Sequence, residues 1–324
     1  AIPAGLPTTS RRASCLMLGL VLAIMAARPL HAEDPVRLEA RLIGQAVIPA
    51  DARLDPPADA PTVLQSAGKF AGPGLAGRHD GSICPLPVEG QPLQGLSSLQ
   101  ALGGGRYLAT ADNGFGRKSN SADAMLVFHV LIPDFSTGNV TIEQSTFLSD
   151  AGRHVPYPLA MEGSDTRYLT GSDFDIEGAV RLGERTYLAD EFGPCLLSVE
   201  TASGAILAVI SARTSDGALV RGPDHPELAL PSTDADLPDY RAARSRGIEG
   251  LAVSPDARHL LAALEGPLWD PVTKEWERIA DERSAARILE KASPAGSGGT
   301  GSGICACGSA RVPLMFFHGQ PLEA

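Results

Sequence analysis

Short runs of apolar residues, each bounded by turn-forming residues, make up most of the chain. Examples are RYLAT at 106–110, MLVFHVLI at 125–132 and TYLAD at 186–190, which are framed by Gly, Asp, Asn or Pro. Bounded runs of this length are typical of β-strands, and apolar stretches with helical periodicity are scarce along the chain. The pattern therefore predicts an all-β protein.

The strand pattern repeats three times. Each unit has a Gly, a short apolar strand, a turn containing Gly or Asp, and a second strand that ends in an acidic residue. The units are GLSSLQALGGGRYLATADNG at 95–114, EGAVRLGERTYLADEFG at 177–193 and EGLAVSPDARHLLAALEG at 249–266. The first two units continue into a further strand pair, so each is expected to form a four-stranded antiparallel sheet.

A four-stranded unit cannot bury both of its faces alone, so stacked copies are expected. Radial stacking into a β-propeller satisfies this requirement and leaves only short protected edges. A β-sandwich with similar hairpins is the alternative. The third unit starts another strand at ARILE, 286–290, and a Gly/Ser-rich stretch follows. We therefore expect a propeller that is incomplete at its C-terminal end.

Three regions are expected along the chain. Residues 1–32 resemble a signal peptide, with Arg11 and Arg12 before an apolar core and a cut at Glu33; an uncleaved anchor is the alternative. Residues 36–290 form the propeller domain, and 291–324 a low-complexity tail, either disordered or out of frame. The signal predicts export to the periplasm or the outside of the cell.

Two insertions interrupt the repeats. Residues 213–245, rich in Pro, Asp and Arg, are expected to form a long surface loop. Residues 269–283 are expected to be either locally helical or a charged excursion from a strand end. Loops of this length often shape the mouth of a binding site.

The charge and cysteine content limit the classes of partner and the disulfide pairings that are expected. The chain of 324 residues has a net charge of −11, which becomes −14 without residues 1–32 because three arginines and no acid are removed. This balance and the absence of a basic stripe argue against nucleic acid as a partner. Cys84 and Cys195 are able to pair in an oxidising compartment, but their spacing leaves this open and fits no zinc pattern. A monomer that leaves the membrane after signal cleavage is expected.

Acidic residues recur at matched places in the three units. Individually, each suits a strand cap or a turn, but their recurrence at strand entrances and ends favours convergence near a propeller axis. Clustered carboxylates repel one another and suit a hard cation such as Ca²⁺. The predicted metal ligands are Asp112, Glu177, Asp190, Glu191, Glu249 and Glu265.

The blocks GLSSL…TADNG, DIEGAV…YLADEFGP and RGIEGLAVSP…LLAALEGPL resemble the phytase-like family of exported bacterial proteins. The resemblance covers roughly residues 40–290. It implies a β-propeller, calcium, and hydrolysis of phosphoesters or carboxylic esters. The spacing of Glu177 and Glu191 is similar to a calcium-binding segment of true β-propeller phytases. The Lys/Arg-rich set that binds phosphate in those enzymes is not recognised in this sequence.

Three functions follow from these observations. The first is a calcium-dependent hydrolase of small phosphate or carboxylic esters, with Glu249 and Arg246 as the catalytic candidates: a carboxylate base and an anion-contacting group. The second is a non-catalytic propeller that binds a ligand or a partner and holds calcium for structure. The third is a lactonase-type propeller with an axial metal.

Overall fold

The computed structural model describes residues 44–277, apart from 50, 73–84, 94, 163, 215–216 and 227–239, together with Leu42 and the strand at 314–316. The chain divides into two compact units, 1–43 and 44–324, and of the first unit only Leu42 is described. The predicted signal peptide, Cys84 and most of 291–324 thus lie outside the described residues. Within the described residues, no helix is both long enough and apolar enough to cross a membrane.

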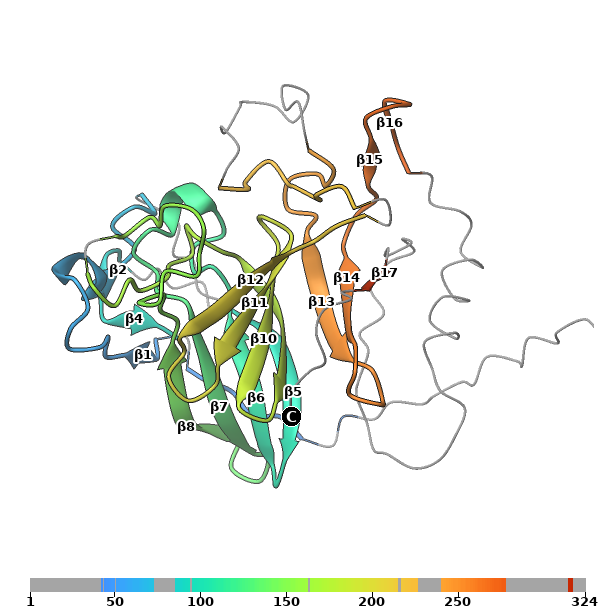
Figure 1. Ribbon diagram of the computed structural model, residues 1–324. Coiled ribbons are helices and arrows are strands. Elements are labelled where there is room, and N and C mark those ends of the chain that lie inside the picture. Colours follow the sequence, from blue (N-terminus) through green and yellow to red (C-terminus); the bar gives the residue numbers. More distant parts are fainter. Residues whose placement is uncertain are drawn as a thin grey trace, which may run out of the picture. The chain divides into compact units, whose positions relative to one another are not determined.

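The first two repeat units each form a four-stranded antiparallel sheet, as predicted (Figure 1). The first sheet follows chain order through β5 (Leu96–Gly103), β6 (Arg106–Ala111), β7 (Val127–Asp134) and β8 (Asn139–Phe147). The second sheet is built in the same way from β9 (Ile176–Leu182), β10 (Arg185–Asp190), β11 (Cys195–Glu200) and β12 (Ile206–Ser211). Each strand pairs with its chain neighbour, across short turns in most cases and across residues 112–126 between β6 and β7.

The third unit forms a three-stranded sheet whose strands are not all consecutive in the chain. Strands β13 (Ile248–Val253) and β14 (Leu260–Leu264) pair as a hairpin, and the next partner of β14 is β17 (Leu314–Phe316). In this pairing Ala262 lies opposite Met315. The third strand of this sheet therefore comes from the segment expected to be a tail, where local sequence gives no strand signal.

The remaining elements are short. Four two-residue strands and a 3-10 helix precede the first repeat unit: β1 (Arg53–Leu54), η1 (Thr62–Leu64), β2 (Ser66–Ala67), β3 (Val88–Glu89) and β4 (Gln91–Pro92). A second 3-10 helix, η2 (Lys118–Asn120), lies between β6 and β7. Residues 269–277 form a hairpin of β15 (Trp269–Asp270) and β16 (Glu275–Trp276), so the described part of this insertion is an excursion and not a helix. The described residues contain almost no helix, which confirms the all-β prediction.

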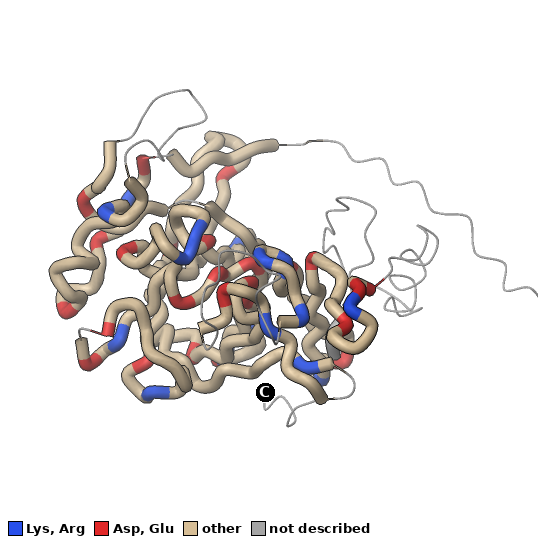
Figure 2. Tube along the Cα trace, turned by 90° about the horizontal axis from the view of Figure 1, so that it is seen from above, with Lys and Arg blue, Asp and Glu red and all other residues tan. Residues whose placement is uncertain are grey.

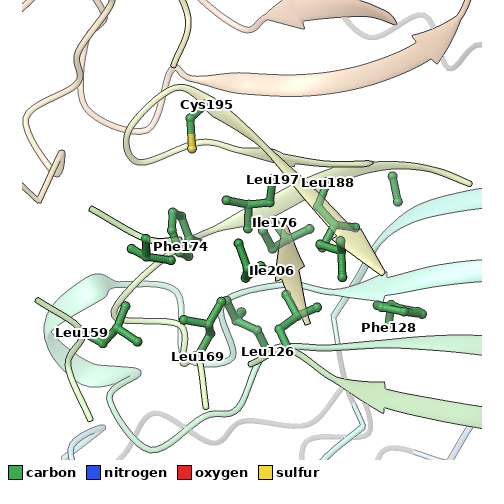
Figure 3. Close-up of a cluster of buried hydrophobic side chains, with 14 of the residues drawn as sticks. Leu126, Phe128, Leu159, Leu169, Phe174, Ile176, Leu188, Cys195, Leu197 and Ile206 are labelled. Carbon is green, nitrogen blue, oxygen red and sulfur yellow. The ribbon is translucent and has the colours of Figure 1, made fainter. Parts of the chain in front are cut away.

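The second sheet is buried on both faces. One face packs on the first sheet through residues such as Leu188 and Leu197, which belong to one hydrophobic cluster with Phe128 (Figure 3). The opposite face, through residues such as Tyr187 and Leu196, packs on β13 and β14. Successive side chains of a strand point to opposite faces, so the uninterrupted apolar runs of β10 and β11 supply both cores.

The first strands of the three sheets are neighbours, with β9 beside both β5 and β13. The Gln100 side chain on β5 accepts the Arg181 backbone N–H of β9 at 2.6 Å. On the other side, a Cβ at Gly178 would lie 3.0 Å from the Cβ of Leu251 on β13. These close contacts bring the ends of the strands, and the acids beside them, to one place.

A buried histidine makes the stability of the first sheet depend on pH. His129 on β7 is fully buried; its Nδ1 lies 2.9 Å from Ser145 Oγ, and its Nε2 has no hydrogen-bond partner among the described residues. Burial lowers the pKa of His129 from 6.5 to about 4. The unfolded chain therefore takes up a proton near pH 6.5 that the folded protein accepts only near pH 4.

We expect the free energy of unfolding to fall between pH 6.5 and pH 4 by on the order of 3 kcal/mol through this residue. Urea unfolding of the wild type and His129→Gln across this range measures the contribution as a difference in pH dependence. The partly exposed His154 provides the matched control His154→Gln, which should retain the wild-type dependence. Equal slopes for wild type and His129→Gln would contradict the prediction.

Candidate functional site

Six carboxylates gather where the strands of the three sheets begin and end. Oxygen atoms of Asp112, Asp175 and Glu177 lie within 4.8 Å of one another, and the same holds for Glu191, Glu249 and Glu265. We call these six residues the acidic site. Figure 2 marks the acidic and basic positions along the chain.

The first group joins the end of β6 to the entrance of β9. Asp112 directly follows β6, and its backbone N–H donates to the Gly95 carbonyl at 2.7 Å. Asp175 is 4 % exposed, and its Oδ2 accepts the Asn113 side-chain amide at 2.8 Å. Glu177 lies two residues further along the strand, so both acids point to the same side of β9.

The second group joins the end of β10 to β13 and to the end of β14. The Glu191 backbone N–H donates to the Asp175 carbonyl at 2.8 Å, which holds the two groups side by side. The Glu265 N–H donates to the Gly247 carbonyl at 2.9 Å, which closes the β13–β14 hairpin. Arg246 forms an ion pair with Glu265 while 51 % of its side chain remains exposed.

The two groups form one electrostatic unit. The pKa of Glu177 is raised to about 8, first by burial and then by Asp112 and Glu249, while a hydrogen bond from Ser97 acts in the opposite direction. Burial and nearby carboxylates likewise raise the pKa of Asp175 and of Glu191. Burial, Glu265 and Asp112 raise the pKa of Glu249, and the Arg246 guanidinium lowers it.

The donor set fits a hard divalent cation. Asp175 Oδ1 is buried and receives no hydrogen bond from the described residues, while the carboxyls of Asp112 and Glu191 lie within hydrogen-bonding reach of Asp175. Ca²⁺ takes oxygen ligands at about 2.4 Å, so two oxygens sharing one ion lie no more than about 4.8 Å apart. The observed separations within each group meet that limit. A cation would also offset the repulsion that raises these pKa values.

Asp190 lies outside both groups, although the sequence places it next to Glu191. Its Oδ1 accepts the Asp175 backbone N–H at 2.8 Å, and its Oδ2 accepts the Gly193 N–H at 2.7 Å. The Cys195 thiol, which is free and buried, approaches Oδ2 at 3.5 Å. The Asp190 carboxylate is therefore occupied in fixing the turn after β10 and the entrance of β9.

A half-buried lysine lies near the turn that carries Glu191. The Lys118 ammonium donates to the Asp224 carbonyl oxygen at 2.7 Å and is attracted by the carboxylates of Asp190, Asp224 and Asp173. Burial lowers the pKa of Lys118 against these attractions. Lys118 thereby ties the loop after β6 to the loop after β12 and places one positive charge beside the turn that carries Glu191.

Five of the six metal ligands that the sequence predicts lie in the acidic site: Asp112, Glu177, Glu191, Glu249 and Glu265. Arg246, predicted to contact anions, lies at the edge of the site against Glu265. Asp175 was not selected, although its position two residues before Glu177 in a strand entrance is a usable signal. Ser97 and Lys118 were also missed, because their neighbours come from distant parts of the chain.

Two glycines allow the segments of the site to approach each other. A Cβ at Gly247 would lie 2.0 Å from the Glu191 carbonyl oxygen, and one at Gly171 would lie 1.7 Å from that of Asn113. Neither position has room for a side chain, because the neighbouring atoms belong to the backbone. The Gly before Ile248 in the third repeat is therefore required by the spacing between Glu191 and β13.

We expect Gly247→Ala to reduce the free energy of unfolding by roughly 2 kcal/mol, because the added methyl group must push the Glu191 backbone away. Gly250→Ala is the matched control, since its Cβ would lie at an ordinary 3.4 Å from Ala263 Cβ. Urea unfolding of both variants tests this comparison. A Gly247→Ala protein as stable as Gly250→Ala would show that the segments separate without cost.

The raised pKa of Glu177 predicts a pH effect in the absence of divalent cations. Its folded pKa of about 8 exceeds the ordinary value of 4.5, so the folded protein binds a proton that the unfolded chain releases. This contribution to stability is complete below about pH 4.5 and is lost as pH rises through 8. In excess chelator, the melting temperature should fall from pH 7.5 to 8.5, a range that lies above the His129 pKa in both states.

Glu177→Gln should flatten that fall, because the amide does not titrate. The matched control is Glu143→Gln, which removes a partly exposed acid on β8 whose partner is Arg106. A melting temperature in chelator that is independent of pH, or that changes equally in all three proteins, would contradict the assignment.

Comparison with known proteins places these residues in a family. The model of the phytase-like family, described as esterase-like activity of phytase, matches residues 91–298. No curated protein matches the chain. Among solved structures, a Bacteroides uniformis protein provisionally described as a 6-phosphogluconolactonase aligns at 15 % identity and a TM-score of 0.25 over 59 % of this chain; the alignment spans 44 % of that protein. With well over half of its residues matched by the family model, the chain belongs to the phytase-like family.

Proposed function

We propose that this protein is an exported hydrolase of small phosphate or carboxylic esters that depends on Ca²⁺ held in the acidic site. The observation that carries the proposal is the buried Asp175 carboxylate, whose Oδ1 has no hydrogen-bond partner among the described residues and faces other carboxyls. Membership of a family described by esterase-like activity of phytase supports the reaction class. Export rests on the signal-like pattern of residues 1–32.

Each of the two groups offers a place for the ion, one formed by Asp175 with Asp112 and Glu177 and the other by Glu191 with Glu249 and Glu265. Bound Ca²⁺ would supply positive charge that attracts and polarises the ester oxygens, in addition to the Arg246 guanidinium at the edge of the site. The site residues would keep the ion fixed, because each group comes from strands that are packed against one another.

The remaining steps fall to the side chains at the rim. Glu249 is partly buried and its pKa is raised, which makes its carboxylate a stronger base for accepting a proton from water. Arg246 keeps half of its side chain exposed and presents a guanidinium beside Glu265, where it would contact an anionic ester oxygen. The Ser97 hydroxyl, which donates to Glu177, would fix that carboxylate in one orientation.

We further propose that the three sheets are blades of a β-propeller. The neighbouring positions of β5, β9 and β13 support this arrangement, since the first strands of propeller blades line a common channel. The acidic site would then lie at one mouth of the channel, where strand ends from different blades meet.

With Ca²⁺ present, the full-length protein should hydrolyse 4-nitrophenyl phosphate or 4-nitrophenyl acetate, and excess chelator should abolish turnover. Glu249→Gln should lower kcat by about 100-fold or more, because the amide does not accept the proton. Arg246→Gln should mainly raise KM for the anionic phosphate ester. The measurement is release of 4-nitrophenol, with thermal melts confirming that each variant is folded.

Glu143→Gln again serves as the control and should retain wild-type turnover. If calcium raises the melting temperature but neither ester is hydrolysed, the non-catalytic alternative with structural calcium gains support. Turnover of lactones in place of both esters would indicate the lactonase alternative. Turnover that is unaffected by chelator would overturn the calcium proposal.

A further inference from the structure

Three aromatic rings cluster at the insertion that follows β14. The Tyr240 ring stacks on Trp269 with centroids 5.8 Å apart and an interplanar angle of 19°. Trp276 meets Trp269 edge-on at 5.2 Å and lies 5.8 Å from Tyr240. We call these three residues the aromatic cluster; it contains both tryptophans of the chain.

The hairpin that carries the two tryptophans is separate from the large sheets. In the described part of the chain, β15 and β16 pair with each other and with no further strand. The hairpin is fixed at its base, where the Trp269 N–H donates to the Arg241 carbonyl at 2.7 Å and the Glu277 N–H donates to the Leu268 carbonyl at 2.8 Å. Arg241 also attracts the Asp270 carboxylate, and Leu268 packs against the core beneath.

The aromatic cluster lies on the chain segments before β13 and after β14. The hairpin of β13 and β14 also brings Glu249 and Glu265 to the acidic site. Trp269 follows Glu265 by four residues, so their Cα atoms lie no more than about 14 Å apart. Tyr240 and Arg241 begin the segment that runs through Arg246 into β13. These two segments are in close contact at Gly266, where a Cβ would lie 3.0 Å from the Arg246 Cβ. The hairpin of β15 and β16 thus continues beyond the end of β14 (Figure 1), and Glu265 directly follows β14.

The three rings differ in their exposure to solvent. Tyr240 is 8 % exposed and forms the buried member, whereas both tryptophans are partly exposed. A hairpin with two-residue strands is marginally stable alone, and its two indoles remain partly accessible to solvent. Indole rings offer a large rigid apolar face that stacks on ring-shaped groups at low cost in conformational entropy.

We propose that the aromatic cluster determines substrate specificity by stacking on a ring in the substrate while the acidic site binds the ester group. The preferred substrates are then esters that carry an aromatic or other flat-faced ring on a short linker. This inference deepens the proposed function and rests on it. Trp269 and Trp276 are specificity residues in this assignment, and the hairpin tip at Val272, 87 % exposed, takes no part.

A matched pair of non-hydrolysable ligands isolates the ring. Butylphosphonate and 4-phenylbutylphosphonate carry the same anionic group and linker, and differ in the phenyl ring alone. In the presence of Ca²⁺, the full-length protein should bind 4-phenylbutylphosphonate about tenfold more tightly, which corresponds to about 1.4 kcal/mol. Because both tryptophans of the chain lie in the aromatic cluster, the ring-bearing ligand should also change the tryptophan emission, whereas butylphosphonate should not.

Variants of the hairpin test whether the indole rings cause the difference in affinity between the two phosphonates. Trp269→Phe and Trp276→Phe each leave one emitting indole and keep a ring in place, while Trp276→Ala removes the ring. Trp276→Ala should reduce the affinity ratio between the two phosphonates towards one and leave the affinity for butylphosphonate unchanged. Val272→Ser, at the tip of the same hairpin, should keep the wild-type ratio.

The outcomes distinguish this inference from the proposed function. If both phosphonates bind with equal, calcium-dependent affinity and without a change in emission, the specificity role is overturned and the proposed function stands. If neither phosphonate binds in the presence of calcium, the inference fails, and the turnover assay with 4-nitrophenyl phosphate and 4-nitrophenyl acetate decides separately whether the proposed function stands. The wild-type emission test does not depend on any variant, so a misfolded variant leaves the result decisive.

Discussion

Repulsion between buried carboxylates is the constraint on which the rest of the structure depends. Oxygens of the acidic site lie within 4.8 Å of one another in each group, and burial raises the pKa of Asp175, Glu177, Glu191 and Glu249. The protein meets this cost through fixed backbone connections. The Glu191 N–H donates to the Asp175 carbonyl, and Asp190 and Asn113 hold the same segment through side-chain hydrogen bonds. These bonds keep like charges together in the absence of any attraction between them.

The second sheet provides the rigidity that this arrangement requires. Because it is buried on both faces, displacing its strand ends would disturb two hydrophobic cores at once. Glu177 at the start of β9 and Glu191 after β10 both depend on it. The first and third sheets contribute Asp112, Glu249 and Glu265 from either side. The site is therefore a property of the contacts between sheets, and no single repeat unit contains it.

Local patterns predicted the repeats and the strands well, because alternation and turn residues act within a few positions of the chain. They also identified the acids at strand ends. They did not predict which of two adjacent acids enters the site. The register of β10 shifts between Ala189 and Asp190, so Asp190 points at backbone amides while Glu191 reaches the other carboxylates. Strand β17, which pairs with β14 across a long segment, and the hairpin at Trp269 depend on contacts that local sequence does not encode.

The charge of the site constrains the order of events in the proposed reaction. Six carboxyl groups outnumber the Arg246 guanidinium beside them, so the site offers an anionic ester little positive charge. An anionic ester is repelled by such a site, so its binding must follow that of a cation. Binding through the aromatic cluster would differ in kind, because stacking is insensitive to the charge of the site and to salt. A ring at the rim would then hold the substrate near Glu265 independently of the ion, and the ion would decide whether the ester group enters. On this view the hairpin and the carboxylates are two separate requirements, and a substrate has to satisfy both.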